Sequence, residues 1–160
     1  MADDALGAEP HEGDWLYVQA PLCHLEEHAA ELVEGITRIV GSAGRLPLLS
    51  PETHGSTRAP HAEPNEALAL AQALIVDLST DAQAVGADVG CAIAAGRPII
   101  GLEHDAAPAG ELLSAAVTAD GRGRLIRYGE PRECLAQLEA TLEDGSWWGL
   151  VAAATPRVSA

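Results

Sequence analysis

Residues 73–102 constrain the fold of this chain more than any other stretch. An apolar run ends at Asp77, a polar turn follows, small and apolar residues then recur at helical spacing, and a second apolar run occupies residues 99–102. Gly96 and Pro98 mark the end of the helical part. A strand, a helix and a second strand joined within about 30 residues form a βαβ unit. We therefore expect these two strands to be neighbours in a parallel sheet.

The same alternation continues on both sides of this unit. It predicts further strands and helices, in chain order, at residues 15–20, 24–41, 46–49, 65–72, 111–117, 125–128 and 131–143. Strands connected by helices in this way favour an α/β architecture, with a five-stranded, mainly parallel sheet and helices on both faces.

The length of the chain, 160 residues, suits one α/β domain, which we place at residues 15–144. Residues 1–14 are acidic and offer little to bury, so we expect a flexible segment there. Residues 145–160 form a C-terminal tail that holds Trp147 and Trp148. We expect these large apolar side chains in a subunit interface or over a neighbour's site. The alternative is that one of them covers the domain's own core.

Acidic residues dominate the charge of the chain. The 24 Asp and Glu residues outnumber the nine basic residues, all of which are arginines, and the net charge is −15. Nucleic-acid polymers and anionic membrane surfaces attract proteins with a basic footprint, so we expect neither as a partner. The three cysteines are far apart without a CxxC motif, and no apolar run is long enough to span a membrane. These features favour a cytoplasmic protein with reduced thiols.

Three carboxylates follow the first strand of the βαβ unit. Asp77 ends the strand, Asp81 lies in the turn, and Asp88 lies in the helix between Gly86 and Gly90. The carboxyl ends of parallel strands are where open α/β sheets bind ligands, and a carboxylate there can act as a nucleophile or a base. The alternative is structural, since Asp77 and Asp81 could serve only as caps of the following helix.

Two further residues are expected near the same edge. Tyr17 lies on the first strand, and Glu66 begins the helix that precedes Asp77, where it could also act only on the helix dipole. His24 and His28 are four residues apart, but no carboxylate or cysteine completes a metal site of known spacing. The chain also lacks a GxGxxG motif after the first strand and a Walker A motif. We therefore expect no metal and no cofactor.

Together these residues resemble the nucleoside 2-deoxyribosyltransferase superfamily, nearest to its small branch of 2′-deoxynucleoside 5′-monophosphate N-glycosidases and CMP hydrolases. The hallmark of that family is a glycine-flanked Glu followed by a basic–Pro–apolar strand. Here the sequence GADVGCA supplies Gly86, Asp88 and Gly90, and RPII supplies the strand. The resemblance covers residues 15–102. It implies a flavodoxin-like (Rossmann-like) three-layer sandwich that forms a homodimer or a higher homo-oligomer.

The family resemblance also implies an activity. Its members cleave the bond between a nucleobase and C1′ of the sugar, by hydrolysis or by transfer to a second base. By position, Asp88 would be the nucleophile, Tyr17 would orient it, and Glu66 would assist departure of the base. The residues expected to line the substrate site are Ala20, Pro21, Arg58, Asp77, Asp81, Ala82 and Gly86.

Departures from the family pattern leave an alternative open. Asp88 stands where the family has Glu, and Glu66 stands where it has Asp, so the nucleophile is shorter by one methylene, about 1.5 Å of reach. Pro21 removes an N–H donor from the loop that binds phosphate in the hydrolases, and the net charge is −15, which favours a nucleoside over a nucleotide. The alternative is a catalytically silent member that binds a nucleoside or nucleotide as a sensor or regulator. A third reading takes the fold as an analogy without shared function.

Overall fold

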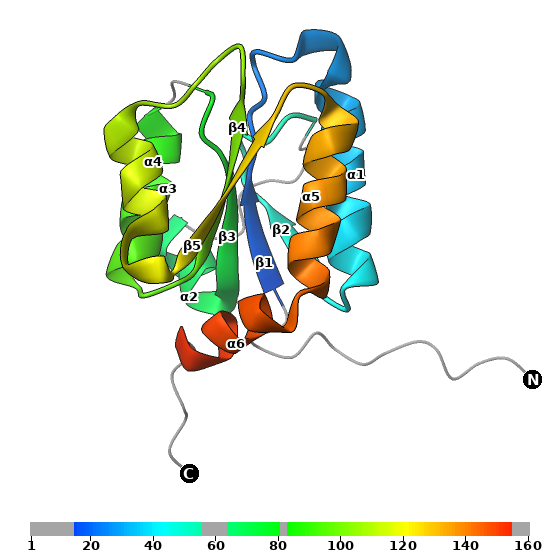
Figure 1. Ribbon diagram of the computed structural model, residues 1–160. Coiled ribbons are helices and arrows are strands. Elements are labelled where there is room, and N and C mark those ends of the chain that lie inside the picture. Colours follow the sequence, from blue (N-terminus) through cyan, green and yellow to red (C-terminus); the bar gives the residue numbers. More distant parts are fainter. Residues whose placement is uncertain (1–14, 56–63, 81–82, 155–160) are drawn as a thin grey trace, which may run out of the picture.

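The computed structural model describes residues 15–55, 64–80 and 83–154. Five strands form one sheet in the order β2-β1-β3-β4-β5, and every neighbouring pair is parallel (Figure 1). The strands are β1 (Trp15–Gln19), β2 (Leu46–Leu49), β3 (Ala71–Asp77), β4 (Ile99–His104) and β5 (Gly123–Tyr128). The predicted α/β class and the βαβ unit are confirmed.

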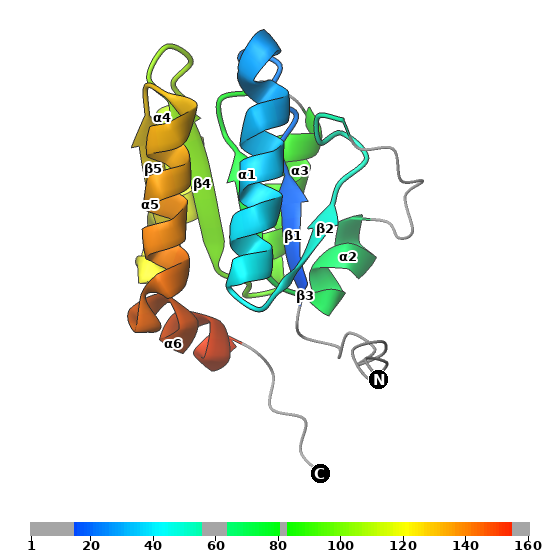
Figure 2. The ribbon, with the colours of Figure 1, turned by 90° about the vertical axis from the view of Figure 1, so that its right-hand side faces the viewer.

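Helices cover both faces of the sheet. They are α1 (Ala29–Ser42), α2 (Pro64–Leu70), α3 (Gln83–Ala94), α4 (Glu111–Thr118), α5 (Pro131–Glu143) and α6 (Gly145–Ala154), with short 3₁₀ helices η1 (Glu26–His28) and η2 (Ala119–Gly121). Helices α1 and α5 lie side by side on one face, as Figure 2 shows, and α2, α3 and α4 lie on the other. Helix α6 crosses the lower end of the sheet in Figure 1. Among the described residues, no helix is long and apolar enough to cross a membrane.

Alternation along the strands divides the core into two parts. Leu16 and Val18 of β1 belong to an apolar cluster beneath α1 and α5, whereas Tyr17 belongs to a second cluster with Val85 and Val89 of α3. Successive side chains of a strand point to opposite faces, so this division follows from the two-residue period. It places Tyr17 on the same side of the sheet as the helix that carries Asp88.

The predicted helix at residues 24–41 is wrong at its start. Helix α1 begins at Ala29, after the 3₁₀ turn η1. Leu22 and Glu26 have positive φ angles of 53° and 41°, which a right-handed helix cannot contain. Leu25 fits the apolar stripe and is buried, but it reaches the core from the connecting loop.

The end of the next predicted helix is also shifted. Helix α2 ends at Leu70, whereas the prediction extended to residue 72. Ala71 already pairs with Trp15 at the start of β3. Strand pairing therefore determines this boundary, and local spacing does not reveal it.

The C-terminal tail is wrong as a description of residues 145–154, because these form helix α6. Trp147 has no exposed surface and packs in the core beneath α1 and α5, so the prediction that it lies in an interface is wrong. Trp148 is partly buried, donates from Nε1 to the Leu142 carbonyl at 2.6 Å, and lies under the guanidinium of Arg45. The sequence gives little helical signal here, since apolar and small residues occur on all sides of α6.

We expect the substitution Trp147→Ala to lower the free energy of unfolding by about 3–5 kcal/mol, because it empties a fully buried site. Urea unfolding followed by fluorescence of the remaining tryptophans measures the change. The matched control is Leu112→Ala, at a side chain that is 86% exposed, with an expected change within about 0.5 kcal/mol. Equal effects of the two substitutions would contradict the assignment of Trp147 to the core.

Candidate functional site

The site lies at the carboxyl end of the sheet, around β1. This strand pairs with both β2 and β3, and the chain leaves β1 toward α1 on one face and β3 toward α3 on the other. Connections that diverge to opposite faces leave a crevice at the strand ends, and open α/β sheets bind ligands in such crevices. Gln19 ends β1, Asp77 ends β3, and Asp88 lies in the second turn of α3.

Asp88 is a buried carboxylate with only 1% of its surface exposed. Gln19 donates from Nε2 to Asp88 Oδ2 at 2.7 Å, and the Tyr17 hydroxyl forms a second hydrogen bond to the carboxylate. Burial raises the pKa of Asp88, and the negative charge of Glu52 adds to the rise, whereas the bonds from Gln19 and Tyr17 act against it. The carboxylate is therefore held by two donors in an environment that disfavours its charge.

Tyr17 acts as a hydrogen-bond donor in this arrangement. Burial raises the pKa of its hydroxyl far above the ordinary value, and the charges of Asp88 and Glu52 raise it further. The phenol therefore keeps its proton at neutral pH and donates it to the Asp88 carboxylate.

The orientation of Gln19 is set by its own partners. Ser50 Oγ donates to Gln19 Oε1 at 2.6 Å, so the amide nitrogen faces the acids. That nitrogen lies 2.7 Å from Asp88 Oδ2 and 3.3 Å from Glu52 Oε2. Ser50 is in turn 2.9 Å from Thr53 Oγ1. The residues after β2 therefore fix the donor that reaches Asp88.

A second buried carboxylate, Asp77, lies at the end of β3. Its Oδ2 accepts hydrogen bonds from the Leu22 N–H at 3.0 Å and from the Thr80 hydroxyl, and its Oδ1 accepts from the Ser79 N–H at 3.0 Å. Leu22 is one of the two residues with a positive φ. Asp77 therefore holds the strained connection between β1 and α1 in place.

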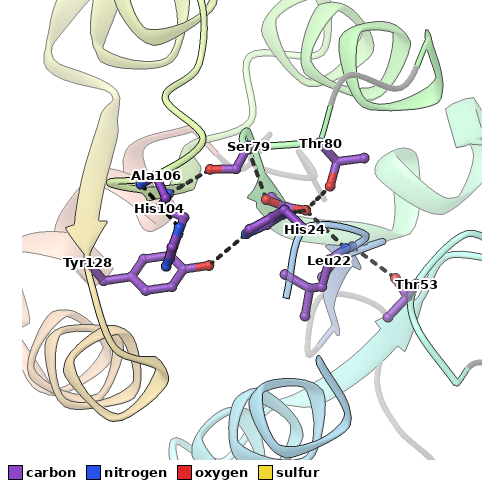
Figure 3. Close-up of polar contacts among 10 residues, drawn as sticks. Leu22, His24, Thr53, Ser79, Thr80, His104, Ala106 and Tyr128 are labelled. Atoms are coloured by element: carbon purple, nitrogen blue, oxygen red, sulfur yellow. Dashed lines mark hydrogen bonds and ion pairs between the residues drawn. The ribbon is translucent and has the colours of Figure 1, made fainter. Parts of the chain in front are cut away.

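Two histidines and a tyrosine meet beside Asp77, as Figure 3 shows. His24 Nδ1 lies 3.9 Å from Asp77 Oδ2, and His24 Nε2 lies 3.5 Å from the Tyr128 hydroxyl. Burial lowers the pKa of His24, the charge of Asp77 opposes this, and the neighbouring His104 lowers the pKa further. Ala106 N–H donates to His104 Nδ1 at 3.2 Å, so Nε2 of that ring carries the proton that it donates to a backbone carbonyl.

The sequence-predicted catalytic residues do not all meet. Tyr17 and Asp88 are in contact. Glu66 is exposed on α2 and forms no hydrogen bond or ion pair with any residue that the structure describes. The roles proposed for these three residues stay predictions.

The predicted substrate-binding residues are scattered. Ala20 uses its backbone N–H and carbonyl in hydrogen bonds to Thr53 Oγ1 and His54, and Pro21 is buried. Gly86 lines a groove of about 590 Å³ between α2 and α3, and it faces away from Asp88 because two helical residues are separated by about 200°. Arg58, Asp81 and Ala82 lie outside the described residues.

Sequence reasoning missed Gln19, Ser50 and Glu52 around Asp88. A signal existed for Gln19, because a polar amide at the inner end of the run WLYVQ is unusual in a buried parallel strand. His24 and His104 were also missed as a pair, since 80 residues of sequence carry no hint of their contact. Within the described ranges, no group of three or more His, Cys, Asp and Glu side chains is arranged to hold a metal ion.

No family model and no curated protein sequence matches this chain. Two solved structures are similar to it. One is a Clostridium botulinum CMP N-glycosidase, BcmB, with 16% identity and a TM-score of 0.60 over 79% of this chain and 98% of that chain. The other is a conserved protein from Enterococcus faecalis, with 16% identity and a TM-score of 0.57 over 80% of this chain and 98% of that chain. At this level of identity the likeness establishes the flavodoxin-like α/β fold alone.

The raised pKa of Asp88 predicts a pH-dependent stability difference between the native chain and the Asp88→Asn variant. A group whose pKa is raised by folding stabilises the folded state below its ordinary pKa of 3.8, and that contribution is lost as the pH rises through the raised value. We therefore expect the free energy of unfolding of the native chain to fall relative to the variant as the pH increases from about 4 to about 7. Urea unfolding of both proteins across this range measures the difference. Parallel stability curves would contradict it.

Proposed function

We propose that this protein cleaves or transfers the N-glycosidic bond of a nucleoside-like substrate, with Asp88 as the nucleophile. The observation that carries the proposal is the Asp88 carboxylate beside the ligand-binding edge of the sheet, held by Gln19 and Tyr17. The N-glycosidase activity of the Clostridium botulinum neighbour, which shares the fold, supports this class of reaction.

The proposed reaction has two steps. An oxygen of Asp88 attacks C1′, the bond from C1′ to the base nitrogen breaks with its electron pair going to the base, and a glycosyl ester forms on Asp88. Water or a second base then attacks C1′, and the C1′–O bond to Asp88 breaks. Attack requires the ionised carboxylate, which the hydrogen bonds from Gln19 and Tyr17 favour against the effect of burial.

Departure of the base requires a proton. We assign this role to Glu66, as the family resemblance implies. Glu66 is exposed and unpaired within the described residues, and its helix α2 packs against α3, which carries Asp88. A substrate that spans the two helices would connect the acid to the leaving group.

The charges around the site favour an uncharged substrate. Gln19 Nε2 lies within 3.3 Å of both Glu52 and Asp88, so two carboxylates converge on one neutral donor. A phosphate there would be repelled. We therefore propose a nucleoside, or another uncharged or cationic glycoside, as the substrate class.

One observation favours a second function, namely nucleoside binding without catalysis. Only 1% of the Asp88 surface is exposed, whereas a nucleophile needs direct access to C1′. In that case Asp88 would be a structural acid beneath a sensor or regulatory site. The two functions differ in whether the base is released.

We expect release of the free base from at least one member of a panel of nucleosides, detected by chromatography. The Asp88→Ala variant should lower the rate by roughly a thousandfold or more, because it removes the nucleophile. Glu139→Ala, at an exposed carboxylate on α5, is the matched control and should retain the native rate. Retained activity in Asp88→Ala would refute the assigned nucleophile. No release by the native protein, together with thermal stabilisation by a nucleoside, would establish the binding function instead.

The substrate class predicts a preference between two forms of the same compound. A nucleoside should be turned over, or bound, more tightly than its 5′-monophosphate by about tenfold, since a difference of one such charge contact is worth about 1.4 kcal/mol. Steady-state kinetics or calorimetry on the pair measures the ratio. A clear preference for the monophosphate would show that the electrostatic argument is wrong.

A further inference from the structure

A second cavity lies at the end of the sheet opposite to Asp88. It has a volume of about 60 Å³ and lies where β4 and β5 begin, between the last turns of α3 and α4. This is the lower end of the sheet in Figure 1. Apolar side chains form most of its wall, and the remaining side chains are two arginines: Ile93, Ile99, Ala116, Val117, Arg97 and Arg122.

The backbone fixes the position of Arg97. Helix α3 ends at Gly96, whose φ of 69° needs a residue without a Cβ, and the Arg97 N–H donates to the Ala92 carbonyl at 2.8 Å. The Arg97 side chain donates from Nη2 to the Ala69 carbonyl at 3.1 Å. Its Nε is buried and has no hydrogen-bond partner among the described residues. One donor of this guanidinium is therefore left for a ligand.

Arg122 approaches the same cavity from the turn before β5. Its Nη1 lies 3.9 Å from the position that a Cβ at Gly96 would take, so the guanidinium covers the end of α3. Within the described part of the chain, the Arg122 side chain forms no hydrogen bond and no ion pair. Two positive groups thus line one cavity without a described carboxylate partner, in a chain that has 24 acidic residues and nine arginines.

The helix ends reduce this positive charge without cancelling it. The carboxyl ends of α3 and α4 flank the cavity, and each helix end carries about half a negative charge. Two guanidinium groups and two helix ends leave about one positive charge. A monoanion matches this balance better than a dianion.

We propose that Arg97 and Arg122 form a binding site for a small monoanionic carboxylate with a short apolar tail. The carboxylate accepts hydrogen bonds from the buried Nε–H of Arg97 and from the guanidinium of Arg122, in the planar geometry that arginine offers to carboxylates. The tail occupies the apolar wall formed by Ile93, Ile99 and Val117. A neighbouring groove of about 430 Å³ shares Gly96 and Arg122 and gives a ligand access along α6.

The site is independent of the chemistry at Asp88. Its ligand would connect the ends of α3 and α4 to the start of β5, and so would stabilise the folded chain by mass action. Binding there can be measured without any glycosidase activity, so failure of either proposal leaves the other standing.

Butyrate, a short-chain carboxylate, is the probe, and amide NMR shifts of the ¹⁵N-labelled full-length protein are the readout. We expect saturable shifts in residues 93–99 and 116–123, with a dissociation constant in the millimolar range that suits a ligand of about six non-hydrogen atoms. The Arg122→Met variant, which keeps the apolar stem and loses the charge, should weaken binding at least tenfold. Arg38→Met, at an exposed arginine of α1, is the matched control and should bind as the native protein does.

Two further ligands test the chemistry of the site. Butyramide has the same shape without the charge and should produce no saturable shift. Inorganic phosphate should bind at least tenfold more weakly than butyrate. The proposal is overturned by any of three results: no saturable shift with butyrate, equal binding by Arg122→Met, or binding of phosphate or butyramide as strong as that of butyrate.

Discussion

The pairing of β1 with both β2 and β3 is the constraint on which the candidate site depends. Parallel strands need crossover connections, so their carboxyl ends come to one edge of the sheet. Gln19, Ser50 and Asp77 therefore lie at neighbouring strand ends although the chain separates them widely. Alternation along β1 then directs Tyr17 toward α3, where it meets Asp88.

Two buried carboxylates at this edge have different environments and therefore different capacities. Asp77 accepts hydrogen bonds from Leu22, Ser79 and Thr80, which commit it to holding the connection between β1 and α1. Asp88 accepts from Gln19 and Tyr17, and burial keeps its pKa raised. A carboxylate whose charge is disfavoured at rest is the more reactive of the two, which is the usual way in which environment separates the roles of paired acids.

Much of the fold could be predicted from local patterns, and much of the site could not. The apolar runs and their spacing predicted five strands in a parallel sheet with helices on both faces, and the glycine at position 96 correctly indicated the end of α3. The start of α1 was not predictable, because the positive φ angles before it are imposed by contacts such as the bond from Leu22 to Asp77. Helix α6 was missed because its apolar residues surround the helix and leave no stripe.

The sequence by itself determined which residues could form strands, helices and turns, because hydrophobic period and turn chemistry act over a few residues. It also indicated Asp88 as the distinctive acid of the central unit. Only the tertiary structure decided what surrounds that acid. Gln19 reaches it from β1 and is oriented by Ser50 after β2, while His24, His104 and Tyr128 meet from three separate elements. Such contacts depend on strand order and register, which are set by packing across the whole sheet and leave no local mark in the chain.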